Sequence, residues 1–160
     1  MWLLALSYWI HLLTTIMWLG GLSTMGLIAL PAWKQQSISD NQWLDLQKRM
    51  LPWVNGSMAL LWISGFIQMT NSEHYSGFLV IDSTWAWAMV LKHVAVIVMT
   101  VVGLYVQLRI YPDMERLALL QSQQKGQREK PLVEREIGLL RINLVCAVVV
   151  LFFTAVATAV

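Results

Sequence analysis

Two histidines lie inside long apolar stretches of the chain, where polar side chains are costly and usually functional. His11 follows Trp2 by nine residues, and His93 follows Trp85 by eight. If both stretches are helices that cross a bilayer in the same direction, a rise of about 1.5 Å per residue puts the two imidazoles at nearly the same depth, roughly 12 to 14 Å inside the outer boundary. Two neutral imidazoles that meet at one depth could hold a metal. The common solution in a membrane bundle is a b-type haem between two His ligands.

The residues around each histidine predict that both imidazoles point into the bundle. Helical spacing places Thr14 and Trp18 beside His11, and Thr100 beside His93. Small and polar residues mark the interior of a membrane bundle rather than its lipid face. We therefore expect Trp18, Thr14 and Thr100 to line a cofactor site whose metal ligands are His11 and His93.

Lys92 is a charged residue at the same depth. It lies about 100° around the helix from His93, so both side chains are not expected to ligate one iron. A cation there could pair with a haem propionate or with an anionic group of a substrate. The alternative is that the long side chain extends to the outer interface and keeps its ammonium in water.

The elements that carry these residues have the composition of a membrane protein. Of the 160 residues, 58% are hydrophobic and 12% are charged, which excludes an ordinary soluble domain. Four stretches reach the roughly 20 residues that a membrane-crossing helix needs: residues 2–30, 51–70, 85–108 and 142–160. We predict an all-α, integral membrane four-helix bundle with up-down-up-down topology. It would form a single transmembrane domain over residues 1–160, with residues 113–141 as a helical cytoplasmic loop.

Basic residues are unevenly distributed among the connections. Of the eleven Lys and Arg residues, ten lie in the first and third connections, and the second, "NSEHYSGFLVIDST", has none. The positive-inside rule therefore predicts a multi-pass protein with both termini on the outer side of the membrane. We expect this to be a bacterial-type inner (plasma) membrane, so that the outer side is periplasmic. The basic residues alternate with acidic ones and form no nucleic-acid-binding motif, so we expect membrane lipid and no nucleic acid as a partner.

Sulfur-containing residues leave few choices for a metal. Cys146 is the only cysteine, so neither a CxxC metal site nor a CxxCH haem attachment can form within the chain. The chain has nine methionines, and copper(I) favours thioethers. Methionines spread through membrane helices, however, usually fill gaps between other side chains.

Tryptophans are frequent near the ends of the four spans. An aromatic belt at the membrane interfaces is expected to contain Trp2, Trp33, Trp53, Trp85 and Trp87. Such residues fix the depth of the helices and need no functional explanation.

Three features together resemble a known family: "HLLTTIMWLGGLSTMGLIALPAW" in the first span, Lys92 inside a later span, and "LLRINLV" before the last span. They resemble the CopD (copper-resistance D) membrane family and the related HemJ-like membrane proteins. The resemblance implies a four-helix membrane domain, linked with copper uptake or resistance in one branch and with haem binding and protoporphyrinogen oxidation in the other. His11 and Lys92 match positions that the HemJ-like branch uses. This chain has Leu144 where HemJ-like chains tend to carry an acidic residue, which disfavours the oxidase activity because no carboxylate remains there for proton transfer.

Three functions therefore stay open at the level of sequence. The first is a membrane haem b protein, similar to a cytochrome b, that transfers electrons or senses redox state near the outer face, with quinol as a candidate donor. The second is a CopD-like protein that transports or handles copper, and the third is a haem-containing accessory subunit of a larger membrane complex. An oxidoreductase activity would fit the haem interpretation, but the sequence does not decide whether the protein is an enzyme. His74, in the second connection, is expected to be an ordinary solvated residue.

Overall fold

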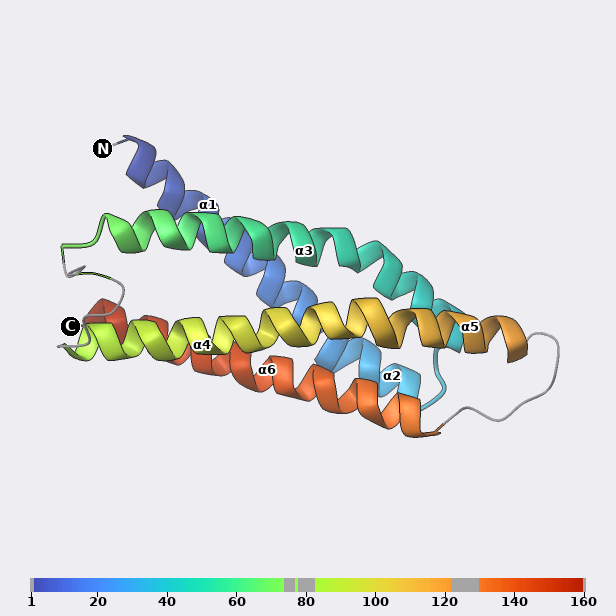
Figure 1. Cartoon of the computed structure of the whole chain (residues 1–160). Helices are drawn as coiled ribbons and strands as arrows, with labels where there is room; N and C mark the ends of the chain where they lie inside the picture. Colours follow the sequence, from blue (N-terminus) through green and yellow to red (C-terminus); the bar gives the residue numbers. More distant parts are fainter. Residues whose placement is uncertain (1, 74–76, 78–82, 122–129, 160) are drawn as a thin grey trace.

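The computed structural model describes residues 2–73, 77, 83–121 and 130–159. Within these residues, four helices are long and apolar enough to cross a membrane: Trp2–Lys34, Asp40–Thr70, Thr84–Arg116 and Glu134–Ala159. Successive helices run in opposite directions, so both termini lie at one end of the bundle (Figure 1). We call this the terminal end, and we call the opposite end, where α2 and α5 lie, the far end. The prediction of an all-helical bundle with up-down-up-down topology is confirmed.

Two of the four spans contain a short π-helical segment. The first span consists of α1 (Trp2–Ser23), η1 (Thr24–Ala29) and α2 (Leu30–Lys34), and the third of α4 (Thr84–Tyr105), η2 (Val106–Ile110) and α5 (Tyr111–Gln121). The second span is α3 (Asp40–Thr70), and the fourth is α6 (Lys130–Ala159). Each π-helical segment ends within two residues of a proline, Pro31 or Pro112. Because proline has no N–H to donate and its ring displaces an earlier carbonyl, a local change of helical winding lets the helix continue past it.

The second helix begins earlier than the apolar run that predicted it. The backbone N–H of Gln42 donates to Ser39 Oγ at 3.3 Å, and the backbone N–H of Ser39 donates to the Gln42 side chain at 2.8 Å. This capping box starts the helix at Asp40 instead of near residue 51. Lys48, which we assigned to a loop, therefore lies on α3.

The helical extensions predicted for the third connection are present. α5 extends the third span to Gln121, and α6 begins at Lys130, ahead of the predicted span. Residues 122–129 of this predicted loop lie outside the described residues, as does His74.

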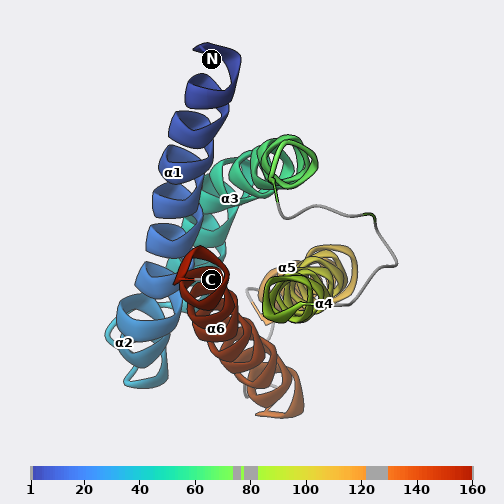
Figure 2. The ribbon, with the colours of Figure 1, turned by 90° about the vertical axis from the view of Figure 1, so that its left-hand side faces the viewer.

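The four spans are arranged as two pairs. α1 packs along α3 and α4 packs along α6 (Figure 2), and the pairs contact each other through α1 with α6 and, at the far end, through α3 with α5. Small side chains allow the close approach of α4 and α6, since α4 buries Ala88 and Ala95 and α6 buries Ala147. Large apolar side chains such as Leu12 and Leu108 are exposed on the outside of the bundle, as expected of a surface in contact with lipid.

Two tryptophans expected in an aromatic belt are buried instead. Trp33 stacks on Trp43 with 4.8 Å between ring centroids and 2° between the planes, and its Nε1 donates to Asp40 Oδ1 at 2.7 Å. Trp85 packs in a buried cluster with Met69 of α3. The belt interpretation is wrong for Trp33 and Trp85, because partners from a neighbouring helix hold both rings inside.

Candidate functional site

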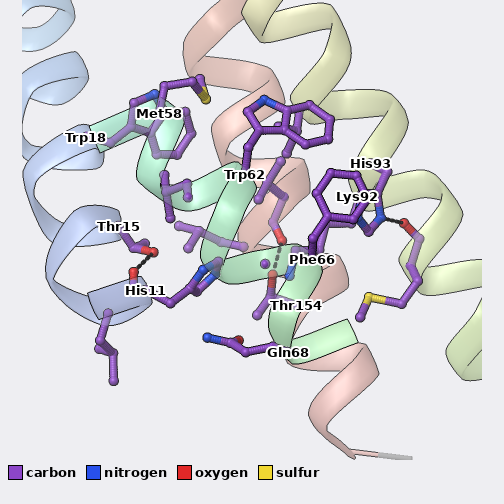
Figure 3. Close-up of a pocket in the computed structure, with 17 residues that line it drawn as sticks. His11, Thr15, Trp18, Met58, Trp62, Phe66, Gln68, Lys92, His93 and Thr154 are labelled. Carbon is purple, nitrogen blue, oxygen red and sulfur yellow. Dashed lines mark hydrogen bonds between the residues drawn. The ribbon is translucent and has the colours of Figure 1, made fainter. Parts of the chain in front are cut away.

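A pocket of about 270 Å³ lies in the terminal half of the bundle, between α1, α3, α4 and α6 (Figure 3). Its polar and sulfur-containing lining comes from all four helices: His11 and Thr15 from α1, Met58 and Gln68 from α3, Met89, Lys92 and His93 from α4, and Thr154 from α6. The rest of the lining is apolar and includes the rings of Trp18, Trp62 and Phe66. The pocket therefore has a mainly apolar wall with a few polar groups, which is typical of small-ligand sites.

α3 holds the imidazole of His11. Nδ1 of His11 lies 2.8 Å from Ser64 Oγ, and the Ser64 hydroxyl donates its single proton to the Leu60 carbonyl at 2.6 Å. With the Ser64 hydroxyl donating to Leu60, its oxygen can accept a hydrogen bond from His11 Nδ1–H. Two further hydrogen bonds fix α1 against α3 at this level, from Ser7 Oγ to the Ser64 carbonyl at 3.4 Å and from Gln68 Nε2 to the Ser7 carbonyl at 3.2 Å.

The imidazole of His93 is held by its own helix and by aromatic rings of α3. Nδ1–H of His93 donates to the Met89 carbonyl at 2.6 Å, and a carbonyl can only accept, so the proton is on Nδ1. The ring centroids of Trp62 and Phe66 each lie 6.3 Å from the imidazole centroid, at tilts of 52° and 46°. Trp62 Nε1 also donates to Thr100 Oγ1 at 3.3 Å, which connects α3 to α4 beside the pocket.

In both imidazoles Nδ1 thus faces a protein oxygen, and Nε2 is left for another partner. Among the residues that the structure describes, neither Nε2 atom makes a hydrogen bond. A neutral imidazole whose Nδ1–H is held by a protein oxygen is the usual state of a metal-binding histidine. Two nitrogen donors, one from α1 and one from α4, are therefore available in one pocket.

Lys92 also lines this pocket, although it lies about 100° around the helix from its neighbour His93. Its side chain is half-buried, and within the described ranges no carboxylate pairs with its ammonium. The pocket therefore combines two imidazoles with the side chain of one lysine.

Of the residues that the sequence predicted for the site, four line the pocket: His11, Trp18, Lys92 and His93. Thr14 does not, and the next residue, Thr15, takes its place in the lining, although the hydroxyls of both donate to carbonyls of their own helix. Thr100 lines an adjoining cavity instead of the pocket. Helical spacing selects a broad face, whereas the pocket is lined by only part of that face.

The sequence analysis missed Ser64, which holds His11. The signal for it is weak but present: Ser57 and Ser64 are seven residues apart, on one face of α3, and both are buried. Two small polar residues with this spacing mark the interior face of a membrane helix. Gln68, one turn further along the same face, also lines the pocket.

The protein groups around the pocket set limits on a metal. The described residues contain no group of three or more His, Cys, Asp or Glu side chains that could hold an ion. Met58 and Met89 line the pocket with the two histidines, and thioethers with imidazoles suit copper(I). The volume of about 270 Å³ lies just below the roughly 300–1,000 Å³ of ligand pockets. It can hold an ion with its ligands, whereas a porphyrin needs more room than this pocket alone provides.

The comparison with protein families gives one match. The model of the family described as "Copper resistance protein D", CopD, matches residues 47–157, well over half of the chain. The match includes Lys92 and His93, but it begins after α1, so His11 lies outside it. Neither the curated proteins nor the solved structures that were compared contain a match to the chain. The helices that span the membrane and the family match together lead to one conclusion: this chain belongs to the CopD family of membrane proteins.

Proposed function

We propose that this protein handles copper within the membrane and that the pocket between α1 and α4 binds copper(I). The observation that carries the proposal is that Nδ1 of each imidazole is hydrogen-bonded to a protein oxygen, while Nε2 has no partner among the described residues. His11 and His93 would supply nitrogen ligands, and Met58 and Met89 are the thioethers within the same lining.

The mainly apolar wall favours the lower oxidation state of copper. The cost of moving an ion out of water rises with its charge, so a singly charged ion is easier to accommodate there than a doubly charged one. Soft thioether ligands act in the same direction.

Haem b is a second candidate, and Lys92 is the observation that favours it. An ammonium in the lining repels a metal cation but attracts a haem propionate. His11 and His93 would then hold the iron from two sides, and the cofactor would supply one-electron chemistry for electron transfer or redox sensing. Such a protein would act alone, with quinol as a candidate donor, or as an accessory subunit of a larger membrane complex. Protoporphyrinogen oxidation remains disfavoured because Leu144 provides no carboxylate.

We propose further that the terminal end faces the outer, periplasmic side of a bacterial-type inner membrane. Exposed basic residues at the far end support this orientation, since Lys48, Arg109 and Arg116 all lie there. The pocket would then lie in the outer half of the membrane and receive copper or an electron donor from that side.

The test is a metal analysis combined with a reduced-minus-oxidised visible spectrum of the purified protein in lipid nanodiscs. We expect the wild type to bind copper(I), and His11→Ala and His93→Ala each to bind it at least about tenfold more weakly, because each removes one ligand. His74→Ala serves as the control and should bind as the wild type does. Equal copper binding by all four proteins would overturn the site. A low-spin haem spectrum that is lost in both pocket variants would establish the haem candidate instead.

A further inference from the structure

A series of cavities extends from the histidine pocket toward the far end of the bundle. A second cavity, of about 430 Å³, shares Trp18, Met58 and Trp62 with the pocket. A third, of about 110 Å³, shares Gln107 and Asn143 with the second. Consecutive cavities therefore share wall residues and follow one another along the bundle, and we call this series the route.

Polar side chains line this route inside an otherwise apolar bundle. Asn55 of α3 and Gln107 of η2 exchange two side-chain hydrogen bonds, at 3.0 and 2.7 Å. Asn143 Oδ1 is buried without a hydrogen-bond partner among the described residues. An unpaired buried oxygen costs about 1–3 kcal/mol. The cavity of about 110 Å³ beside it has room for roughly three water molecules at about 30 Å³ each, so water is the partner that fits.

Glu136 of α6 lies at the far end of this route, and its side chain is 0% exposed. Oε1 accepts hydrogen bonds from Trp43 Nε1 at 3.1 Å and from the Gln47 side chain, and Gln47 lines the third cavity. Oε2 is buried without a hydrogen-bond partner in the described part of the chain. An unpaired charge at such a position is very costly, and a proton on Oε2 removes it.

The charged groups of the neighbouring helices do not neutralise this carboxyl. On the surface, Lys48 pairs with Glu115 and lies 5.8 Å from the ring centroid of Tyr111, which lines the third cavity. Asp40 accepts a hydrogen bond from Trp33. The other charged side chains described at this end are exposed: Lys34, Asp45, Arg49, Arg109, Asp113, Arg116, Glu134, Arg135 and Arg141.

We propose that Glu136 binds a proton at Oε2 and exchanges it, through water in this route, with the histidine pocket. The step transfers one proton from the carboxylic acid to water, past Asn143 and the Asn55–Gln107 pair, and needs no oxidant or reductant. The proton site is independent of whether the pocket takes copper or haem, so it goes beyond the proposed function.

The first test is an infrared titration of the full-length protein in nanodiscs. The wild type should show the carbonyl band of a protonated carboxylic acid, shifted in D₂O because water reaches the group. Glu136→Gln should lose this band, and Glu134→Gln, which changes an exposed glutamate of the same helix, should keep it. A wild type without the band, or a band that survives Glu136→Gln, would overturn the proposal. Metal content, measured on the same samples, should be unchanged by Glu136→Gln.

The second test measures whether water enters the route, and it does not depend on the folding of Glu136→Gln. In a Cys146→Ala background, Gly103→Cys places a thiol between the second and third cavities, where an added Cβ meets nothing within 4 Å. Val101→Cys, on the outer surface of the same helix, is the matched control. Because a thiol must ionise to react, a water-soluble thiol reagent should modify Gly103→Cys at least about tenfold faster. Adding Asn143→Leu should slow that reaction. Equal rates at the two cysteines would overturn the hydrated route.

Discussion

Replacing Ser64 with Ala removes the oxygen that accepts the hydrogen bond from His11 Nδ1–H at 2.8 Å. Without this acceptor the imidazole can turn and can carry its proton on Nε2, which blocks that nitrogen as a ligand. Mutation of such a supporting partner typically lowers metal affinity 10–100-fold. At about 1.4 kcal/mol per factor of ten, the expected loss of binding free energy is about 1.4–2.8 kcal/mol.

The matched control is Ser57→Ala. Ser57 is also a buried serine of α3 whose hydroxyl donates to a carbonyl of its own helix, the Val54 carbonyl at 2.9 Å, but unlike Ser64 it makes no hydrogen bond to a described residue of the pocket. Copper(I) affinity of the two variants can be measured in nanodiscs by competition with a chromophoric chelator, and thermal unfolding can be recorded on the same samples. We expect Ser64→Ala to bind copper(I) about 10–100-fold more weakly than Ser57→Ala does. Equal affinities would refute both the proton position on His11 and its role as a ligand.

Three further predictions concern charge, packing and orientation. Lys92→Met should strengthen copper(I) binding about tenfold or more, because it removes a repelling charge. If the protein binds haem instead, the variant should keep the haem and lower its midpoint potential. An unchanged copper(I) affinity and an unchanged midpoint potential would contradict a role for this charge. Gly26→Ala should destabilise the protein by about 1–3 kcal/mol in an unfolding titration, because the added Cβ would lie 2.5 Å from a leucine side chain of α6. Gly20→Ala is the control and should leave the stability unchanged, because its added Cβ meets nothing within 4 Å. Equal stabilities of the two variants would contradict the packing described. With the native cysteine replaced, a cysteine at Ser76 should be labelled from outside the cell and one at Ser122 should be spared, and the reverse pattern would invert the orientation.

The depth of the two histidines could be predicted from the sequence because a helix has a fixed rise per residue. Counting from Trp2 and from Trp85 was enough to place His11 and His93 at one level, and both line one pocket. The rotation of each helix about its axis is set by packing between helices, which the counting does not include. This is why the analysis selected Thr14 although Thr15 lines the pocket.

Glu136 shows a second reason why part of the site could not be predicted. Its sequence context, "LVEREIGLL", has the alternation of charged and apolar residues that a solvent-exposed helix also has, so it was assigned to the cytoplasmic loop. Its burial depends on Trp43, which is 93 positions away in the sequence and whose Nε1–H donates a hydrogen bond to the Glu136 carboxyl. Trp43 is itself held in place by stacking on Trp33. Contacts between residues so far apart are not encoded in local periodicity. A glutamate flanked by exposed charges therefore gives no local signal that it is fully buried.

The volume of the pocket favours a copper ion, whereas the charge of Lys92 favours a haem. A substitution of Lys92 can therefore distinguish the two occupants. The volume of about 270 Å³ suits an ion with its ligands, but an ion adds positive charge to a lining that already holds an ammonium. A haem would balance that ammonium with a propionate, but it needs more room than the pocket alone provides. Moving α1–α3 away from α4–α6 would make that room, but it would break hydrogen bonds between the two pairs, such as those of Trp62 with Thr100 and of Asn55 with Gln107. Lys92→Met therefore distinguishes the two occupants. Tighter copper(I) binding by the variant means that the Lys92 charge opposes the ion, and a lower haem midpoint potential means that the charge stabilises the reduced cofactor.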